Sequence, residues 1–188
     1  VALPGSHDSL PRLILFSFHT EAIMIAICGT MYKGIANPGL FSIALAAKKD
    51  KKSHRVFVLM SDGECDEGSV WEAALFASHL KLDNVIAIID YNKIQSFGKT
   101  NEVLNLEPLK QKWESFGWQV TEVDGHDYQK LEKTFNALPF KNDCPNLIIA
   151  HTQKGKGISF MENKLEWHYK SPSKEQYDAA LKELHNHA

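Results

Sequence analysis

Apolar runs and helical patterns alternate along residues 46–155 of this chain. Short apolar runs predict strands at RVFVLM (55–60), VIAIID (85–90), WQVTEVDG (118–125) and NLIIAHT (146–152). Apolar positions at helical spacing between these runs predict helices at residues 69–82, 106–117 and 127–138. Strand–helix–strand units with short connections form parallel sheets that are buried on both faces. The predicted fold class is therefore α/β, an open and mostly parallel sheet with helices on both faces.

Polar residues mark where several of these helices begin and end. The segment SIALAAKK (42–49) predicts a helix end, because its cations lie in the last turn where the helix dipole favours them. Ser69 and Glu72 form an S-x-x-E capping box, which predicts a helix start. Asp127 is the predicted cap of the next-to-last helix, and residues 173–185 predict a charged amphipathic helix at the end.

Residues 1–45 are less regular than the rest. The segment TEAIMIAICG (20–29) is compatible with a helix start, but no continuous architecture is predicted for this region. One hypothesis is that residues 1–45 are discontinuous fragments of a longer native segment, because their pattern is irregular and shortened. The first residue is Val and not Met, so a native start that is missing here is also expected. We predict one domain over residues 1–188, with a βαβ core at 46–155 and an extension with a helix at 156–188.

Composition narrows the class of protein. The 188 residues suit one domain, and a net charge of −2 does not indicate a nucleic-acid surface. The three Cys form no CxxC pair, which argues against a disulfide scaffold and suits a reducing cytoplasm. The longest apolar stretch, Ala22–Cys28, is too short to span a bilayer, and no basic segment of a signal peptide precedes it.

An acidic turn, SDGECDEG (61–68), follows directly on one predicted strand. Asp62 lies just past this strand and Asn92 just past the next one, so both are expected at the carboxyl edge of a parallel sheet, where ligands bind. Carboxylate, amide and carbonyl oxygens suit Mg²⁺ or Ca²⁺, and Gly63 allows a phosphate to approach the backbone. Taken alone, each of these residues is more often part of an ordinary turn. Their pairing across one crossover predicts a diphosphate–metal site.

Four segments together resemble one enzyme family. Residues 61–98 resemble the thiamine-diphosphate motif, and more closely the transketolases. The resemblance continues through FGWQVTEVDGHD (116–127), HTQKGKG (151–157) and EWHYKSP (166–172). It is strongest for the amino-terminal subunit of split bacterial transketolases, in which the two halves are separate polypeptides, and it covers Phe41–Tyr177. It implies a thiamine-diphosphate-binding fold.

The resemblance assigns roles to individual residues. Asp62 and Asn92 would bind Mg²⁺ through side-chain oxygens, and Ile94 through its backbone carbonyl. Gly63 would donate its backbone N–H to the diphosphate. His168 would be catalytic, reaching toward the diphosphate and a substrate hydroxyl, although a packing role beside Trp167 and Tyr169 is the alternative.

Three further acidic residues belong to the same prediction. Glu64 is grouped with the cofactor-binding residues. Its side chain is expected either to be solvated or to contact the residues that bind the cofactor, rather than the cofactor itself. Glu67 and Glu72 would match acidic residues at the subunit interface that connect two active sites. The alternatives are local, since Glu72 would complete the capping box and Glu67 would add charge to the first helical turn.

The activity implied by the resemblance is transfer of a two-carbon ketol unit from a ketose phosphate to an aldose phosphate, with thiamine diphosphate and Mg²⁺ as cofactors. In this family the Glu that protonates the aminopyrimidine lies on the pyrimidine-binding half, which is absent here. A carboxy-terminal partner subunit is therefore expected, in a heterotetramer or a dimer of halves.

Two departures from the family pattern keep other readings open. Ser61 replaces the first Gly of the motif, and Ile35 stands where the family has a histidine. Deoxyxylulose-phosphate synthase and the pyruvate dehydrogenase alpha subunit share the metal motif. A non-catalytic homologue that keeps the fold but has an eroded site is a second alternative. A flavodoxin-like nucleotide binder is a third, although no Gly-rich phosphate loop is visible.

Overall fold

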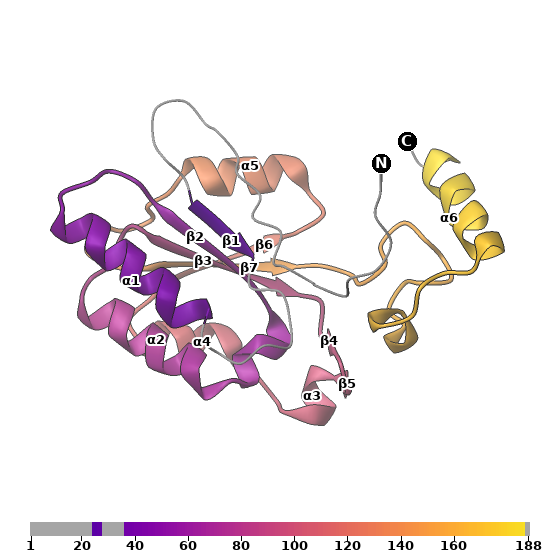
Figure 1. Ribbon diagram of the computed structural model, residues 1–188, viewed down its shortest axis with the longest axis horizontal. Helices are drawn as coiled ribbons and strands as arrows, with labels where there is room; N and C mark the ends of the chain where they lie inside the picture. The colour runs from indigo at the N-terminus through magenta and orange to yellow at the C-terminus, as the bar shows by residue number, and fades with distance from the viewer. Residues whose placement is uncertain (1–23, 28–35, 187–188) are drawn as a thin grey trace, which may run out of the picture.

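A five-stranded sheet forms the centre of the molecule. The computed structural model describes residues 24–27 and 36–186. All neighbouring strands of the sheet are parallel, in the order β1-β2-β3-β7-β6. The strands are β1 (Met24–Ile27), β2 (Val56–Ser61), β3 (Val85–Tyr91), β6 (Gln119–Asp124) and β7 (Asn146–His151) (Figure 1). This confirms the predicted α/β class.

Helices cover both faces of the sheet. On one face lie α1 (Ala36–Lys49), α2 (Gly68–His79) and α4 (Leu109–Ser115), and on the other lies α5 (Tyr128–Asn136) (Figure 1). From β1 through β2 and β3 to β6, each new strand lies farther along the sheet in the same direction. The last step, from β6 to β7, runs in the reverse direction, because β7 lies between β3 and β6. Because parallel crossovers are right-handed, this reversal moves α5 to the opposite face. Two separate apolar clusters result, one under α1, α2 and α4 and one under α5.

The position of each strand in the sheet explains its burial. Five of the six residues of β7 are buried, as are five of the seven of β3, because each has neighbours on both sides and helices on both faces. β6 has only two buried residues, Val120 and Val123, and its Glu122 and Asp124 are exposed, as expected for the last strand of the sheet. The nearly continuous apolar runs at 85–90 and 146–152 therefore correspond to two of the three interior strands.

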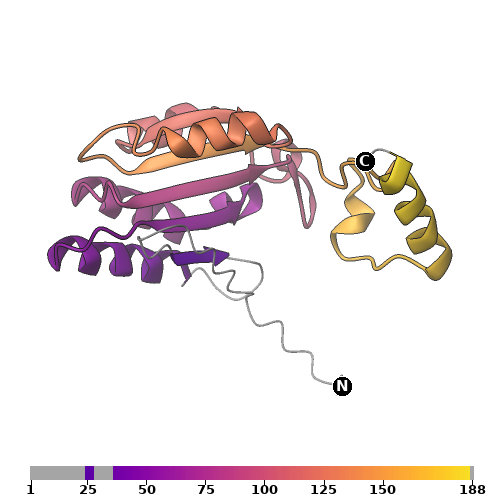
Figure 2. The same cartoon turned by 90° about the horizontal axis from the view of Figure 1, so that it is seen from above.

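Smaller elements extend from the carboxyl ends of the strands. They are η1 (Asp62–Asp66), β4 (Ile94–Gln95), β5 (Gly98–Lys99), α3 (Thr100–Val103), η2 (Leu165–His168) and α6 (Lys174–Asn186). The hairpin β4–β5 is antiparallel, and η2 lies against β4. The segment that carries η2 and α6 lies beyond the carboxyl end of the sheet, as Figure 2 shows from above.

The capping box predicted at Ser69 and Glu72 is wrong. α2 begins at Gly68 with Glu67 as its N-cap, so Ser69 lies inside the first turn. The Ser69 Oγ is buried and has no hydrogen-bond partner among the described residues. An S-x-x-E pair does occur eight residues earlier, at the start of η1, where the Glu64 carboxylate accepts hydrogen bonds from the Ser61 N–H at 2.7 Å and the Ser61 Oγ at 3.2 Å.

Residues 1–45 contribute more regular structure than their pattern predicted. Met24–Ile27 is a strand, so the helix start predicted at residues 20–29 is wrong there. The pairing partner decides this, since Met24 to Ile27 align in parallel register with Val56 to Leu59 of β2. Ile35 and the rest of residues 1–23 and 28–35 lie outside the described residues. Within the described part of the chain, no helix is both long and apolar enough to cross a membrane.

Candidate metal and diphosphate site

The carboxyl edge of the sheet brings the two predicted ligand segments together. In the parallel register of β2 and β3, Ser61 lies opposite Asp90, so Asp62 and Asn92 follow neighbouring strand ends. The loop after β3 closes onto Asp62, because the Lys93 N–H donates to Asp62 Oδ2 at 2.6 Å. Lys93 adopts φ of 66°, a left-handed conformation that is uncommon for a side chain of this size. The expected proximity of residues 62 and 92 is confirmed.

Asp62 is a buried carboxylate with one unsatisfied oxygen. The residue is 1% exposed, and its Oδ1 has no hydrogen-bond partner among the described residues. Burial raises the pKa of the Asp62 carboxyl from 3.8 to about 6, and the charges of Asp90 and Asp66 act in the same direction. A buried carboxylate in this setting is stabilised by a proton or by a cation. Asp62 therefore fits a divalent-ion ligand.

Asn92 is held at both ends of its amide group. Its Oδ1 accepts a hydrogen bond from the Ile94 N–H at 2.9 Å, and its Nδ2 donates to Asp90 Oδ2 at 3.4 Å. An amide oxygen has two lone pairs, so one remains for a cation. Ile94 is buried at the start of β4, on the same loop as Asn92. Asp62, Asn92 and the backbone at Ile94 thus form an oxygen-rich group that suits Mg²⁺ or Ca²⁺.

Gly63 and Glu64 have local structural roles in the acidic turn. A Cβ on Gly63 would lie 3.0 Å from the Gln95 Cβ, so a larger residue here would push the Gln95 side chain of β4 away by a few tenths of an ångström. The Gln95 side chain in turn donates to Asp66 Oδ2 at 2.9 Å. Glu64 is occupied by its hydrogen bonds to Ser61. The predicted cofactor contacts of Gly63 and Glu64 remain predictions.

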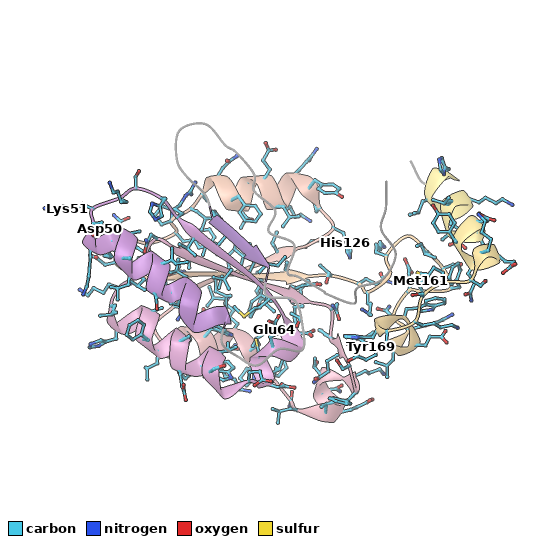
Figure 3. The ribbon with its side chains drawn as sticks, viewed as in Figure 1. Asp50, Lys51, Glu64, His126, Met161 and Tyr169 are labelled. Atoms are coloured by element: carbon cyan, nitrogen blue, oxygen red, sulfur yellow. The ribbon has the colours of Figure 1, made fainter. Side chains whose placement is uncertain are left out.

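The segment after β7 places His168 at the same edge of the sheet. His168 ends η2, which lies against β4, the strand that carries Ile94. Its Nδ1 is buried without a hydrogen-bond partner in the described residues, and its ring packs against Tyr169 at 4.6 Å between centroids. Burial, and then the charge of Lys154, lowers the pKa of the His168 imidazole. In Figure 3, the neighbouring Tyr169 and Glu64 both lie away from the end of the molecule that carries Asp50.

The two predicted interface residues, Glu67 and Glu72, are both exposed on and beside α2. They share this helix with two exposed apolar side chains, Leu75 at 60% and Phe76 at 44% exposure. Large apolar groups at such exposure are compatible with a subunit interface. The interface role of the two Glu residues remains a prediction.

Beside the acidic turn lies a cavity of about 300 Å³, lined by Cys65, Trp71, Leu104, Asn105, Leu106, Lys112 and Phe116. Burial raises the pKa of the Cys65 thiol, so this cysteine stays protonated and is a poor nucleophile.

Among the described residues, no cluster of three or more His, Cys, Asp or Glu side chains has the geometry of a metal site. The predicted ligand set contains only one such side chain and depends on amide and carbonyl oxygens for the rest.

Sequence reasoning missed two residues at this edge, Asp90 and Thr152. The Thr152 hydroxyl donates to Asp90 Oδ1, and Asp90 contacts Asn92. An acidic residue at the end of an otherwise apolar strand was the available signal for Asp90. Thr152 has no such signal, because its contact depends on β7 lying next to β3.

Known proteins match most of this chain. Residues 18–186 match the family described as transketolase, thiamine diphosphate binding domain. One subunit of an apulose-4-phosphate transketolase from Phocaeicola vulgatus is 45% identical over 142 residues, which are 76% of this chain and 50% of that protein. The 6-deoxy-6-sulfo-D-fructose transketolase subunit SqwG from a Clostridium species is 42% identical over 142 residues, 76% of this chain and 52% of that protein.

A solved structure matches the fold as well. Transketolase from Campylobacter jejuni superposes with a TM-score of 0.75 at 31% identity, over 81% of this chain and 25% of that chain. This chain spans about half the length of the curated relatives it matches. The family match over 18–186, together with the α/β fold, shows that this chain belongs to the transketolase family, in which it corresponds to the amino-terminal, thiamine-diphosphate-binding half.

Proposed function

We propose that this chain is the diphosphate-binding subunit of a transketolase that uses thiamine diphosphate and Mg²⁺. The reaction is the transfer of a two-carbon ketol unit from a ketose phosphate to an aldose phosphate. The observation that carries the proposal is the buried Asp62 carboxylate, whose Oδ1 has no partner within the described residues. When bound, the cofactor supplies the nucleophilic carbon that breaks the carbon–carbon bond of the ketose.

The chain's own residues hold the metal and the diphosphate in this proposal. Asp62 and Asn92 bind Mg²⁺ through side-chain oxygens, and Ile94 through its backbone carbonyl. Gly63 donates its backbone N–H to the diphosphate, with Glu64 fixing the turn that presents it. Ca²⁺ can substitute for Mg²⁺, because the same oxygen ligands suit both ions.

His168 accepts or returns a proton at a substrate hydroxyl. The lowered pKa of its imidazole means that it is neutral near pH 7 and can act as a base. Its Nδ1 is buried and has no hydrogen-bond partner in the described part of the chain, so a hydrogen bond from a bound ligand would satisfy it.

A partner protein that carries the pyrimidine-binding domain completes the site. Two kinds of observation support this: several relatives are named as single subunits of a transketolase, and Glu67, Glu72, Leu75 and Phe76 are exposed on and beside α2. Glu67 and Glu72 lie at the interface in this arrangement, which is a heterotetramer or a dimer of halves.

The domain organisation and location of the chain belong to the same proposal. Residues 46–155 form the core of a single diphosphate-binding domain, and residues 156–188 are its extension. Cys65 and Cys144 are free and buried, in keeping with a reducing cytoplasm.

The substrate is a phosphorylated sugar, with a sulfonated sugar as the second candidate. Apulose-4-phosphate appears in the name of two relatives, and 6-deoxy-6-sulfo-D-fructose in the name of a third. Both kinds of substrate place an anionic group on the end of a ketose. Turnover assays with a ketose phosphate and a 6-sulfo ketose against one aldose acceptor separate the two.

Calorimetry of thiamine diphosphate binding, with Mg²⁺ and the partner subunit, tests the proposal. We expect Mg²⁺-dependent heat for the wild type and none for Asp62→Ala, because the substitution removes a metal ligand. Asp50→Ala is the matched control, since Asp50 is exposed and lies at the end of α1, well away from Glu64 in Figure 3. No binding by the wild type would favour a non-catalytic homologue that keeps only the fold.

A further inference from the structure

A chain of contacts crosses three neighbouring strand ends at the carboxyl edge. It runs from Gly125 after β6, through Thr152 after β7, to Asp90 in β3 and then to Asn92. The Thr152 hydroxyl donates to Asp90 Oδ1, and Asn92 Nδ2 donates to Asp90 Oδ2 at 3.4 Å. Each carboxylate oxygen of Asp90 is thus directed to a different partner.

Backbone packing holds Thr152 in place. Its N–H donates to the Tyr91 carbonyl at 3.3 Å, which continues the β3–β7 pairing past the end of β7. A Cβ on Gly125 would lie 2.5 Å from the Thr152 Cγ2, so the methyl group packs tightly against the glycine backbone. The Gly125 N–H donates to the His151 carbonyl at 2.8 Å, which keeps this turn against β7. These contacts restrict the side-chain rotamer of Thr152 and therefore the direction of its hydroxyl.

The carboxylate of Asp90 and the Ile94 N–H together determine which way round the Asn92 amide lies. An ionised carboxylate only accepts hydrogen bonds, so it takes the NH₂ group of Asn92 and not its oxygen. The Asn92 Oδ1 is consequently turned away from Asp90, toward the Ile94 N–H, with which it forms a hydrogen bond at 2.9 Å. A flipped amide would place its oxygen against the Asp90 carboxylate, and these two acceptors repel each other.

We infer that Asp90 and Thr152 are positioning residues that fix the Asn92 amide so that its oxygen faces the cation. The inference rests on the proposed function, because it assigns Asn92 as a ligand of Mg²⁺. Thr152 orients Asp90, and Asp90 orients Asn92, so neither residue needs to touch the ion. Groups that orient metal ligands in this way commonly contribute about 10- to 100-fold to metal affinity.

Metal affinity tests this inference without an activity assay. The probes are Mg²⁺, titrated by calorimetry with thiamine diphosphate and the partner subunit present, and Mn²⁺, followed by electron paramagnetic resonance. We expect Thr152→Val to weaken binding of both ions about 10-fold, and Asp90→Asn about 10- to 100-fold. Asn in place of Asp90 can accept or donate, so it no longer imposes one orientation on Asn92. Thr152→Ser keeps the hydroxyl and should restore affinity to within about threefold of the wild type.

Controls separate positioning from general destabilisation. Thr121→Val makes the same chemical change in β6, where the hydroxyl has no hydrogen bond among the described residues, and should leave the affinity unchanged. A positioning role predicts unchanged melting of metal-free Asp90→Asn with a smaller rise in Tm on adding Mg²⁺. Wild-type affinity in both Thr152→Val and Asp90→Asn would overturn the inference alone. Absence of Mg²⁺-dependent binding in the wild type would overturn the proposed function, and the inference with it.

Discussion

The acidic turn after β2 and the segment that carries His168 contribute to the same edge of the sheet in different ways. Asp62 follows directly on a buried strand and is held by backbone from the neighbouring strand end, at 2.6 Å from the Lys93 nitrogen. His168 lies on a 3₁₀ turn outside the sheet, in which no residue is fully buried. The proposed metal-binding part is therefore built into the core, whereas the proposed proton-transfer part depends on a separate segment of lower local stability.

Two tryptophan substitutions test this difference most strongly. Trp113 is fully buried and packs against Trp118 and Trp71 at 4.9 and 5.2 Å between ring centroids. Trp167 is half-buried beside Phe160 on the segment before His168. We expect Trp113→Ala to lower the free energy of unfolding by about 3–5 kcal/mol, and Trp167→Ala by about 1 kcal/mol. Urea unfolding followed by circular dichroism measures both, and equal losses would show that the two regions unfold as one unit.

Replacing His168 should separate catalysis from metal binding. We expect His168→Asn to lower kcat about 100-fold, because a general base typically contributes at least that factor, while the Kd for Mg²⁺ stays the same. His185→Asn is the control, since His185 is exposed on α6 and far along the chain from the site. Steady-state kinetics and calorimetry give the two values, and a parallel loss of Mg²⁺ affinity would place His168 in the metal site instead.

The raised pKa of Asp62 predicts how metal binding depends on pH. Below about pH 6 the Asp62 carboxyl holds a proton and cannot bind a cation, so Mg²⁺ affinity should fall by up to about tenfold per pH unit. The metal-free protein should behave in the opposite sense, losing stability as pH rises from about 4 to 6, because the buried carboxyl must then ionise.

Calorimetry and thermal melting between pH 4 and 7.5 check both trends. Asp62→Asn provides the reference, because it removes the titrating group and leaves all other groups in place. A difference between wild type and Asp62→Asn that does not change with pH would contradict the assignment of this pKa.

The smallest effect concerns the close contact between the acidic turn and β4. Gly63→Ala places a Cβ 3.0 Å from the Gln95 Cβ and should cost about 1 kcal/mol of stability. Gly68→Ala is the matched control, because a Cβ there meets nothing within 4 Å, and a neutral or slightly stabilising effect is expected. Equal effects of the two substitutions, measured by urea unfolding, would show that the β4 loop adjusts freely to the turn.

The main strands and helices were predictable because their patterns are decided locally. The runs at 85–90 and 146–152 are apolar almost throughout, and their short length and β-branched residues favour strands buried on both faces. Met24–Ile27 could not be predicted as a strand, because a four-residue apolar segment takes the structure of its neighbour β2. The S-x-x-E signal was real but ambiguous, since it occurs at both Ser61 and Ser69 and only one position lies at a helix start.

In the site, too, contacts between segments joined by one crossover were predictable, whereas contacts that depend on the order of strands in the sheet were not. Asp62 and Asn92 were predicted to be close because one crossover joins their strands, and the Lys93–Asp62 hydrogen bond bears this out. The link from Thr152 to Asp90 spans 62 positions and exists only because β7 lies beside β3. The sequence order of strands does not reveal this neighbourhood, since β6 precedes β7 in the chain but lies farther from β3.

The interior position of β7, between β3 and β6, has a consequence for how the chain acquires its structure. β3 and β6 are separated in the sheet by a strand that is synthesised after both of them. Until residues 146–151 are available, each of these strands has an open side with unpaired backbone groups, which can pair with other chains. Folding is therefore completed by insertion rather than by addition at an edge, and a nascent or truncated chain that ends before β7 is most exposed to aggregation.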